Sequence, residues 1–219
     1  MRYCTVLFVL VTSTLLVGCG SSKDASKSNF QVAIDKAMSK DCVVVGPGMN
    51  LMATSHSYPQ SFPLTQVGMF TNAEAAKQMN DRMEAPYEAL VKAGLLEGKD
   101  DQVPMLGNST KLVPSRTYSL TDKGKKYLIA PDGTSFCASH YKVDEVVEFT
   151  QPGPSMGGST ESMAKFTYSA TDVADWAQTD DFKSAFPDAA KQLTPKREGS
   201  AEMVLMNDGW TANVERGFF

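Results

Sequence analysis

The first patterned segment of the chain is residues 30–40, in which apolar side chains recur at the spacing of an α-helix. Asn29 stands where the N-cap of such a helix is expected. The β-branched run at residues 42–45 then predicts a short buried strand. The apolar positions i, i+4, i+7 and i+8, which share one helix face, are Phe30, Ile34, Ala37 and Met38.

The middle of the chain predicts two further helices with a break between them. Thr71 or Asn72 is placed to cap the first of them. Pro86 favours the first turn of a helix, so we expect the chain to break there and a second helix to run to Gly94.

Residues 85–129 carry a motif that resembles the winged-helix module. A helix that ends in Ala-Gly-Leu-Leu is followed, beyond residues 99–116, by Tyr-x-Leu-Thr-x-x-Gly, in which Thr121 caps the next helix. The resemblance implies that Leu120 packs under the helices and that Gly124 lets the next helix sit close. Residues 99–116 would form a wing-like hairpin or loop. The motif describes packing and carries no chemistry.

From Gly133 onwards apolar and polar residues alternate, which predicts β-structure. Two short helices are expected after residue 171 and after residue 180, and an Asp-Gly turn at residues 207–209 predicts a hairpin. Because helices come first and strands later, we expect an α+β fold with a helical, winged-helix-like lobe (30–134) and a β-rich antiparallel lobe (135–219). The predicted strands are 135–139, 141–149, 162–168, 201–206 and 210–214.

Residues 1–18 have the composition of a signal peptide, because Arg2 precedes an uncharged, mostly apolar run that ends in small residues. The sequence Leu-Val-Gly-Cys at 16–19 resembles the bacterial lipoprotein box. The resemblance implies cleavage before Cys19 and acylation of its sulfur. Since Gly20 and not aspartate follows, the resemblance implies, for a Gram-negative cell, sorting to the outer membrane with the protein facing the periplasm. A plain secretory peptide and an uncleaved anchor are the alternatives. Residues 19–29 predict a flexible tether.

Charge and cysteine content limit the possible partners and cofactors. The chain has a formal charge of −4, and cleavage removes Arg2 but no acid, so a nucleic-acid partner is not expected. After processing, Cys42 and Cys137 remain, and in an oxidising compartment they most simply form one structural disulfide. A metal site and a redox pair are less favoured because the C-x-x-C spacing is absent and the chain has only two histidines. No metal or cofactor is predicted.

Catalytic motifs are weak. His56 and His140 stand in no metal-binding spacing. Residues 162–165 match S-x-x-K, but they lie in a predicted strand, which would point Ser162 and Lys165 to opposite faces.

These patterns favour a lipid-anchored, non-enzymatic binding module of the cell envelope, with an inhibitor, immunity or assembly-accessory role and another envelope or secreted protein as partner. A cell-wall or lipid-acting enzyme with an unrecognised site is the alternative. Partner contact is expected at the loop around Met156 and at the basic side chains Lys123, Lys125 and Lys126. Methionine side chains, which adapt to irregular surfaces, are a further hint: Met49, Met52, Met69, Met79, Met83 and Met105.

Overall fold

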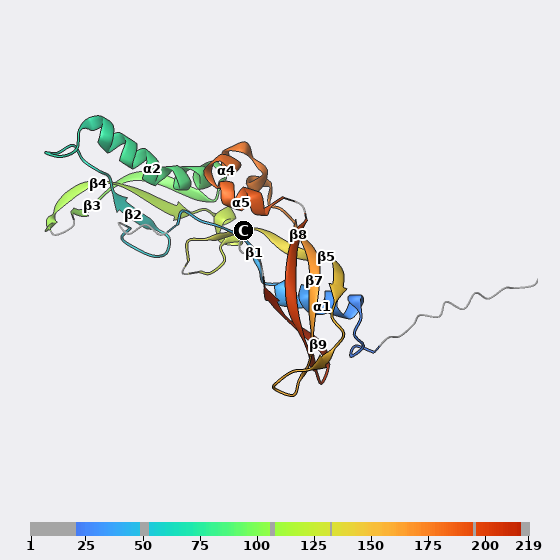
Figure 1. Cartoon of the computed structure of the whole chain (residues 1–219). Coiled ribbons are helices and arrows are strands. Elements are labelled where there is room, and N and C mark those ends of the chain that lie inside the picture. Colours follow the sequence, from blue (N-terminus) through green and yellow to red (C-terminus); the bar gives the residue numbers. More distant parts are fainter. Residues whose placement is uncertain (1–20, 49–52, 106–107, 132, 195, 216–219) are drawn as a thin grey trace, which may run out of the picture.

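A computed structural model describes residues 21–48, 53–105, 108–131, 133–194 and 196–215. The protein is α+β, and its elements form an elongated molecule with two parts (Figure 1). One part is a curled six-stranded antiparallel sheet with a helix across it, and the other is an arm built on a three-stranded antiparallel sheet. The predicted fold class is therefore confirmed at this level.

The six-stranded sheet has the order β1-β5-β7-β8-β9, and the short β6 pairs with β7. Helix α1 (Lys27–Met38) packs against β5 and β9 with Phe30 and Ile34 fully buried. The strands are β1 (Cys42–Val45), β5 (Phe136–Phe149), β6 (Gly153–Pro154), β7 (Thr160–Thr171), β8 (Arg197–Met206) and β9 (Gly209–Glu215).

The arm contains the second sheet, in the order β2-β4-β3, and the long helix α2 (Ala73–Lys92), which lies along it (Figure 1). Its strands are β2 (Gln60–Pro63), β3 (Leu96–Met105) and β4 (Asn108–Leu120), and α3 (Asp122–Tyr127) follows β4. Between β7 and β8 the chain forms η1 (Asp175–Gln178), α4 (Asp180–Ala185) and α5 (Pro187–Gln192), and α4 packs on α2.

The sheets do not divide the chain at residue 134. Helix α1 and strand β1, which the sequence pattern assigns to the first lobe, join the later sheet, because β1 pairs with β5 and α1 covers β5 and β9. The chain then builds the arm and returns to complete the sheet. One buried apolar cluster runs through both parts, from Phe30 on α1 to Phe62 and Tyr87 in the arm.

Two predictions about the helices are corrected. The first helix runs from Lys27 to Met38, and its N-cap is Ser26 and not Asn29, because the Ser26 hydroxyl accepts a hydrogen bond from the Asn29 amide. Helix α2 continues through Pro86 without the predicted break. A proline inside a helix removes one backbone hydrogen bond, but Tyr87 beside it is buried in the core and holds the helix in place.

For the segment 99–116, where a hairpin or a loop was predicted, the structure shows the hairpin. The segment is part of an antiparallel hairpin of β3 and β4 whose register runs from Leu96 opposite Leu120 to Met105 opposite Asn108. Of the strand predictions, the late hairpin is confirmed, since β8 and β9 pair around the turn at Asn207 and Asp208.

Gly124, the glycine of the Tyr-x-Leu-Thr-x-x-Gly motif, lies against the chain at the end of α2. A Cβ atom on this residue would lie 2.1 Å from the carbonyl oxygen of Leu95 and 3.2 Å from Leu120. The Thr121 hydroxyl caps α3 by accepting from the Gly124 amide at 2.9 Å, and it donates to the carbonyl of Gly94 at 2.7 Å. Glycine is required here because α3 crosses the backbone at the end of α2 without room for a side chain.

Candidate functional site

The most exposed apolar side chains of the arm lie on a tight turn just before α2. The backbone amide of Gly68 donates to the carbonyl of Thr71 at 2.9 Å, and the Thr71 amide returns a bond to Gly68 at 3.3 Å. This turn points Met69 and Phe70 outwards, with 91% and 95% of their surfaces exposed, next to the exposed Val67. We call Val67, Met69 and Phe70 the apolar tip.

The turn is held in place by α2. The Asn80 side chain accepts a hydrogen bond from the amide of Thr65 at 2.7 Å and donates one to its carbonyl at 3.1 Å. On the other side of the turn, the Asn72 side chain caps α2 by accepting from the Ala75 amide at 2.9 Å. The apolar tip is thus presented on a fixed support, which lowers the entropy lost when a partner immobilises it.

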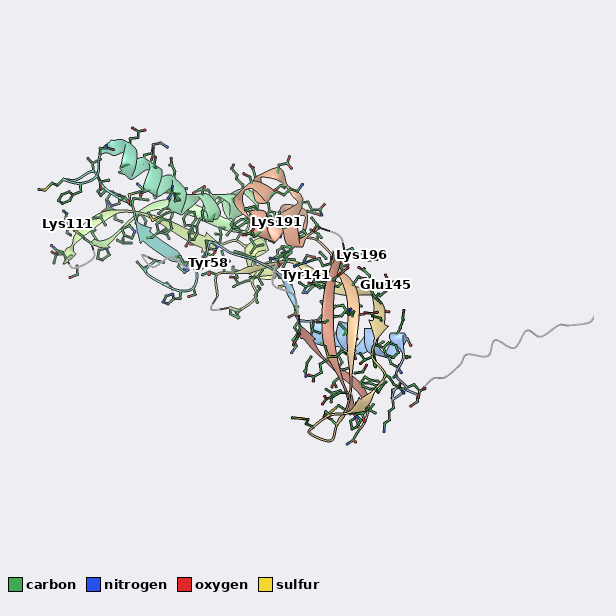
Figure 2. The ribbon with its side chains drawn as sticks, in the orientation of Figure 1. Tyr58, Lys111, Tyr141, Glu145, Lys191 and Lys196 are labelled. Carbon is green, nitrogen blue, oxygen red and sulfur yellow. The ribbon has the colours of Figure 1, made fainter. Side chains whose placement is uncertain are left out.

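The apolar tip lies at the free end of the arm, where the β3–β4 hairpin also ends (Figure 1). Lys111 marks this hairpin end in Figure 2. Met79 on α2 and Met105 and Leu112 on the hairpin are also exposed. Of the methionines singled out from the sequence, Met69, Met79 and Met105 are therefore at the surface of the arm, Met83 is partly buried against the core, and Met49 and Met52 lie outside the described residues.

No ionisable residue lies next to the apolar tip in the sequence. Residues 64–73 contain no ionisable side chain, and the first charge after them is the exposed Glu74. Further along α2, Lys77 pairs with Asp81, and this hydrogen bond raises the pKa of the lysine. The turn can therefore enter an apolar environment without desolvating a charge.

Behind the apolar tip, the arm is reinforced by a polar network between α2 and its sheet. The Arg116 guanidinium donates to Glu88 at 3.0 Å and to Asp100 at 3.1 Å, and the Tyr118 hydroxyl donates to Glu88 at 2.8 Å. Burial is the main cause that raises the pKa of the Tyr118 hydroxyl above its ordinary value. Burial also raises the pKa of Glu84. The network holds α2 on β4 and leaves Tyr118 a hydrogen-bond donor at neutral pH.

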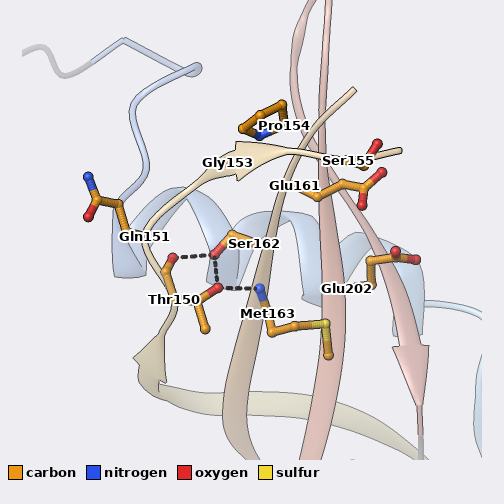
Figure 3. Close-up of a pocket in the computed structure, with 9 residues that line it drawn as sticks. All are labelled: Thr150, Gln151, Gly153, Pro154, Ser155, Glu161, Ser162, Met163 and Glu202. Carbon is orange, nitrogen blue, oxygen red and sulfur yellow. Dashed lines mark hydrogen bonds between the residues drawn. The ribbon is translucent and has the colours of Figure 1, made fainter. Parts of the chain in front are cut away.

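Met156 lies at the other end of the molecule, in the turn between β6 and β7, and its side chain is fully exposed. Beside the turn is a shallow pocket of about 260 Å³ (Figure 3). The Ser162 hydroxyl in the pocket donates to the Thr150 carbonyl at 2.6 Å, and the Met163 amide donates to the Thr150 hydroxyl at 2.9 Å. The lining residues are Thr150, Gln151, Gly153, Pro154, Ser155, Glu161, Ser162, Met163 and Glu202.

The S-x-x-K match at residues 162–165 lies in a strand, as the sequence pattern predicts. Ser162 is buried and Lys165 is exposed on strand β7, and Lys165 pairs with Glu148 at 2.7 Å. The two side chains therefore point to opposite faces of the sheet, and the lysine does not activate the hydroxyl.

The three lysines predicted for partner contact lie on α3, which packs on β4 and β5 and not beside Met156. The ammonium group of Lys123 donates to the carbonyl of Ala93 at 2.8 Å, where it caps the C-terminus of α2. Lys125 pairs with Asp122 at 2.9 Å. Two of these cations thus have partners within the arm.

Cys42 on β1 and Cys137 on β5 approach each other to about 2.7 Å, and no disulfide bond joins them in the structure. Strand pairing places Cys42 opposite His140, and the Cys137 sulfur lies 3.8 Å from the Nε2 atom of that histidine. The two residues are half-buried at the edge of the six-stranded sheet. No cluster of three or more metal-ligating side chains forms within the described segments.

Cys19, the predicted lipidation site, lies outside the described residues. Within the described segments, no helix has the length and apolar character needed to cross a bilayer. No family model, curated protein or solved structure matches the chain.

Val67 and Phe70 were not predicted from the sequence as contact residues. The available signal was the uncharged, partly apolar run at 64–71 directly before the helix cap Asn72. Such a run is equally typical of a buried strand, and only its position in the fold shows that it is exposed.

Proposed function

We propose that the protein is a lipid-anchored, non-enzymatic binding module of the bacterial cell envelope, and that the apolar tip binds a partner protein. The anchor in this proposal is an acylated Cys19 at the periplasmic side of the outer membrane, as the lipoprotein-box resemblance implies. The observation that carries the binding role is the exposure of Met69 and Phe70 on a turn braced by α2.

A protein pocket fits this surface better than a lipid surface does. The apolar tip is narrow, since it consists of the side chains of one tight turn. The nearest charge along the chain is the acidic Glu74, which would be repelled by anionic lipid. Burial of a Phe or Met side chain contributes about 1.5–3 kcal/mol, so Met69 and Phe70 together can supply the centre of an interface. The expected partner therefore has an apolar pocket with a basic side chain at its rim.

The arrangement of the two ends supports the same function. The first described residues lie at the end of the six-stranded sheet, whereas the apolar tip lies at the end of the arm (Figure 1). A protein anchored through its N-terminus would hold the tip away from that anchor, where a periplasmic or opposing envelope protein can reach it.

Two finer structural features belong to the proposal. We propose that Cys42 and Cys137 form a disulfide in the oxidising periplasm, which their close approach on adjacent strands supports. We also propose that the unit of α2, the β3–β4 hairpin and α3 is winged-helix-like, which the contact between Gly124 and Leu95 supports.

The test is crosslinking of the lipidated protein in its native envelope, followed by mass spectrometry, for the wild type and for a variant with both Met69→Ser and Phe70→Ser. We expect the variant to lose one specific protein partner while its melting temperature stays the same, because both side chains are exposed. The matched control is Val32→Ser, which removes an exposed apolar side chain from α1 at the other part of the molecule. A partner retained by the double variant would contradict the proposal, and a glycan or lipid recovered instead would favour the enzyme alternative at the pocket beside Met156.

A further inference from the structure

Residues 21–26, which the sequence pattern assigns to a flexible tether, are packed against the end of the six-stranded sheet. We call them the N-terminal strap. The Ser22 hydroxyl donates to the carbonyl of Asp208 at 3.2 Å, and the Trp210 indole donates to the carbonyl of Lys23 at 3.1 Å. The first bond joins the strap to the β8–β9 turn and the second joins it to the start of β9.

The strap is also held by α1. The Asn29 side chain donates to the carbonyls of Ser21 and Asp24, each at 2.8 Å. The Trp210 ring that binds the strap packs edge-on against Phe30 with ring centres 4.8 Å apart, so the contact is tied to the core. The described part of residues 19–29 is therefore attached to the sheet and does not act as a spacer.

The length of chain before the strap sets how far the sheet can stand from an anchor. Cys19 and Ser21 are two residues apart, and an extended chain spans at most about 3.6 Å per residue, so their separation is at most about 7 Å. An acyl chain on Cys19 therefore brings the β8–β9 turn to the membrane surface.

The exposed turn that carries Met156 lies at this same end. Strand pairing sets Glu161 opposite Val204, and Met206 opposite Gly209, so the β6–β7 and β8–β9 turns are neighbours. Met156 is fully exposed between Ser155 and two glycines, with no charge from residue 152 to residue 160.

The charges around the strap are mixed. Among the described residues, Lys23 and Lys27 are accompanied by the acidic Asp24 and Asp208, and this balance of charge gives little attraction for anionic lipid. Contact with a membrane would depend on the covalent anchor and on an apolar side chain.

We propose that this end of the sheet lies directly on the membrane that holds the acyl chains, with Met156 in the interfacial layer of the lipid. The inference rests on the proposed lipidation of Cys19. The partner of this end of the sheet is the anchoring bilayer. The strap orients the domain so that the arm projects away from that bilayer.

The test uses the lipidated full-length protein reconstituted into phosphatidylcholine vesicles, with photoreactive benzoylphenylalanine placed at position 156. We expect lipid adducts at position 156, and at least several-fold fewer when the same group replaces Phe70 at the apolar tip. Protein that enters the vesicles without lipid adducts at position 156, or with as many at position 70, overturns this inference alone. Protein that fails to enter the vesicles overturns the proposed lipid anchor.

A second variant tests whether the short connection between the anchor and the strap is what places Met156 in the lipid. Insertion of ten Gly and Ser residues between Gly20 and Ser21 leaves the lipoprotein box and the strap intact and adds a flexible spacer with an end-to-end length of about 18 Å. We expect unchanged vesicle binding and a several-fold loss of lipid adducts at position 156. Unchanged adducts after the insertion would show that Met156 reaches the lipid without the short connection, which contradicts the proposed orientation.

Discussion

The contact at Gly124 offers a direct test of how the arm is packed. In Gly124→Ala, the new Cβ atom would lie 2.1 Å from the Leu95 carbonyl oxygen, so helix α3 has to retreat by about 0.9 Å to reach even the 3.0 Å limit of real contacts. The neighbouring atom belongs to the backbone and cannot rotate away. Overpacking costs about 1–3 kcal/mol, and occasionally more.

The gain in helix propensity works against this cost. Alanine is more favourable than glycine inside a helix by about 1 kcal/mol. With overpacking at the upper end of its range, we expect a net loss of about 2 kcal/mol, which corresponds to a fall in melting temperature of about 4–8 °C for a chain of this size.

Thermal unfolding followed by circular dichroism measures this change, with Gly153→Ala as the matched control. A Cβ atom on Gly153 would meet no other atom within 4 Å, and the φ angle of this residue is not positive. Its substitution should therefore shift the melting temperature by less than about 1 °C. A Gly124→Ala protein with the same melting temperature as the wild type would refute the close packing of α3 on the end of α2.

Three further outcomes are expected. Leu90→Asp should unfold the arm, because Leu90 is fully buried and the carboxylate would have no partner; a normal melting curve would show that the α2 face is misassigned. Non-reducing mass spectrometry of protein from its native envelope should find a peptide that links Cys42 to Cys137, and two alkylated thiols would contradict the proposed disulfide. Cys19→Ala should abolish acylation, which incorporation of labelled fatty acid measures. Continued labelling of the variant would contradict the proposed lipoprotein assignment.

Several parts of the fold could be predicted because the forces that decide them act over a few residues. The Thr121 cap and the hairpin turn at Asn207 and Asp208 depend on neighbours close in sequence. The need for glycine at position 124 arises from the carbonyl of Leu95, which lies in another segment, and only the family resemblance implied it. The predicted helix break at Pro86 was wrong. The burial of Tyr87 and Leu90 against the arm sheet outweighs the one backbone hydrogen bond that the proline removes.

The candidate sites divide in the same way. The sequence pattern already indicates that Met156 lies in a turn and that Ser162 and Lys165 point to opposite faces of a strand. It does not indicate that residues 64–73 protrude, because an apolar, uncharged run is equally typical of a buried strand.

By itself, the sequence determined the α+β class, most of the helix and strand positions, and the pattern from which a lipid anchor is proposed. Only the tertiary structure decided which segments meet. The strap is bound by Asp208 and Trp210, which lie 186 and 187 positions further along the chain than their partners Ser22 and Lys23. A polar segment such as residues 21–26 has no apolar period of its own, so its place on the sheet depends on these distant partners together with the hydrogen bonds from Asn29 on α1.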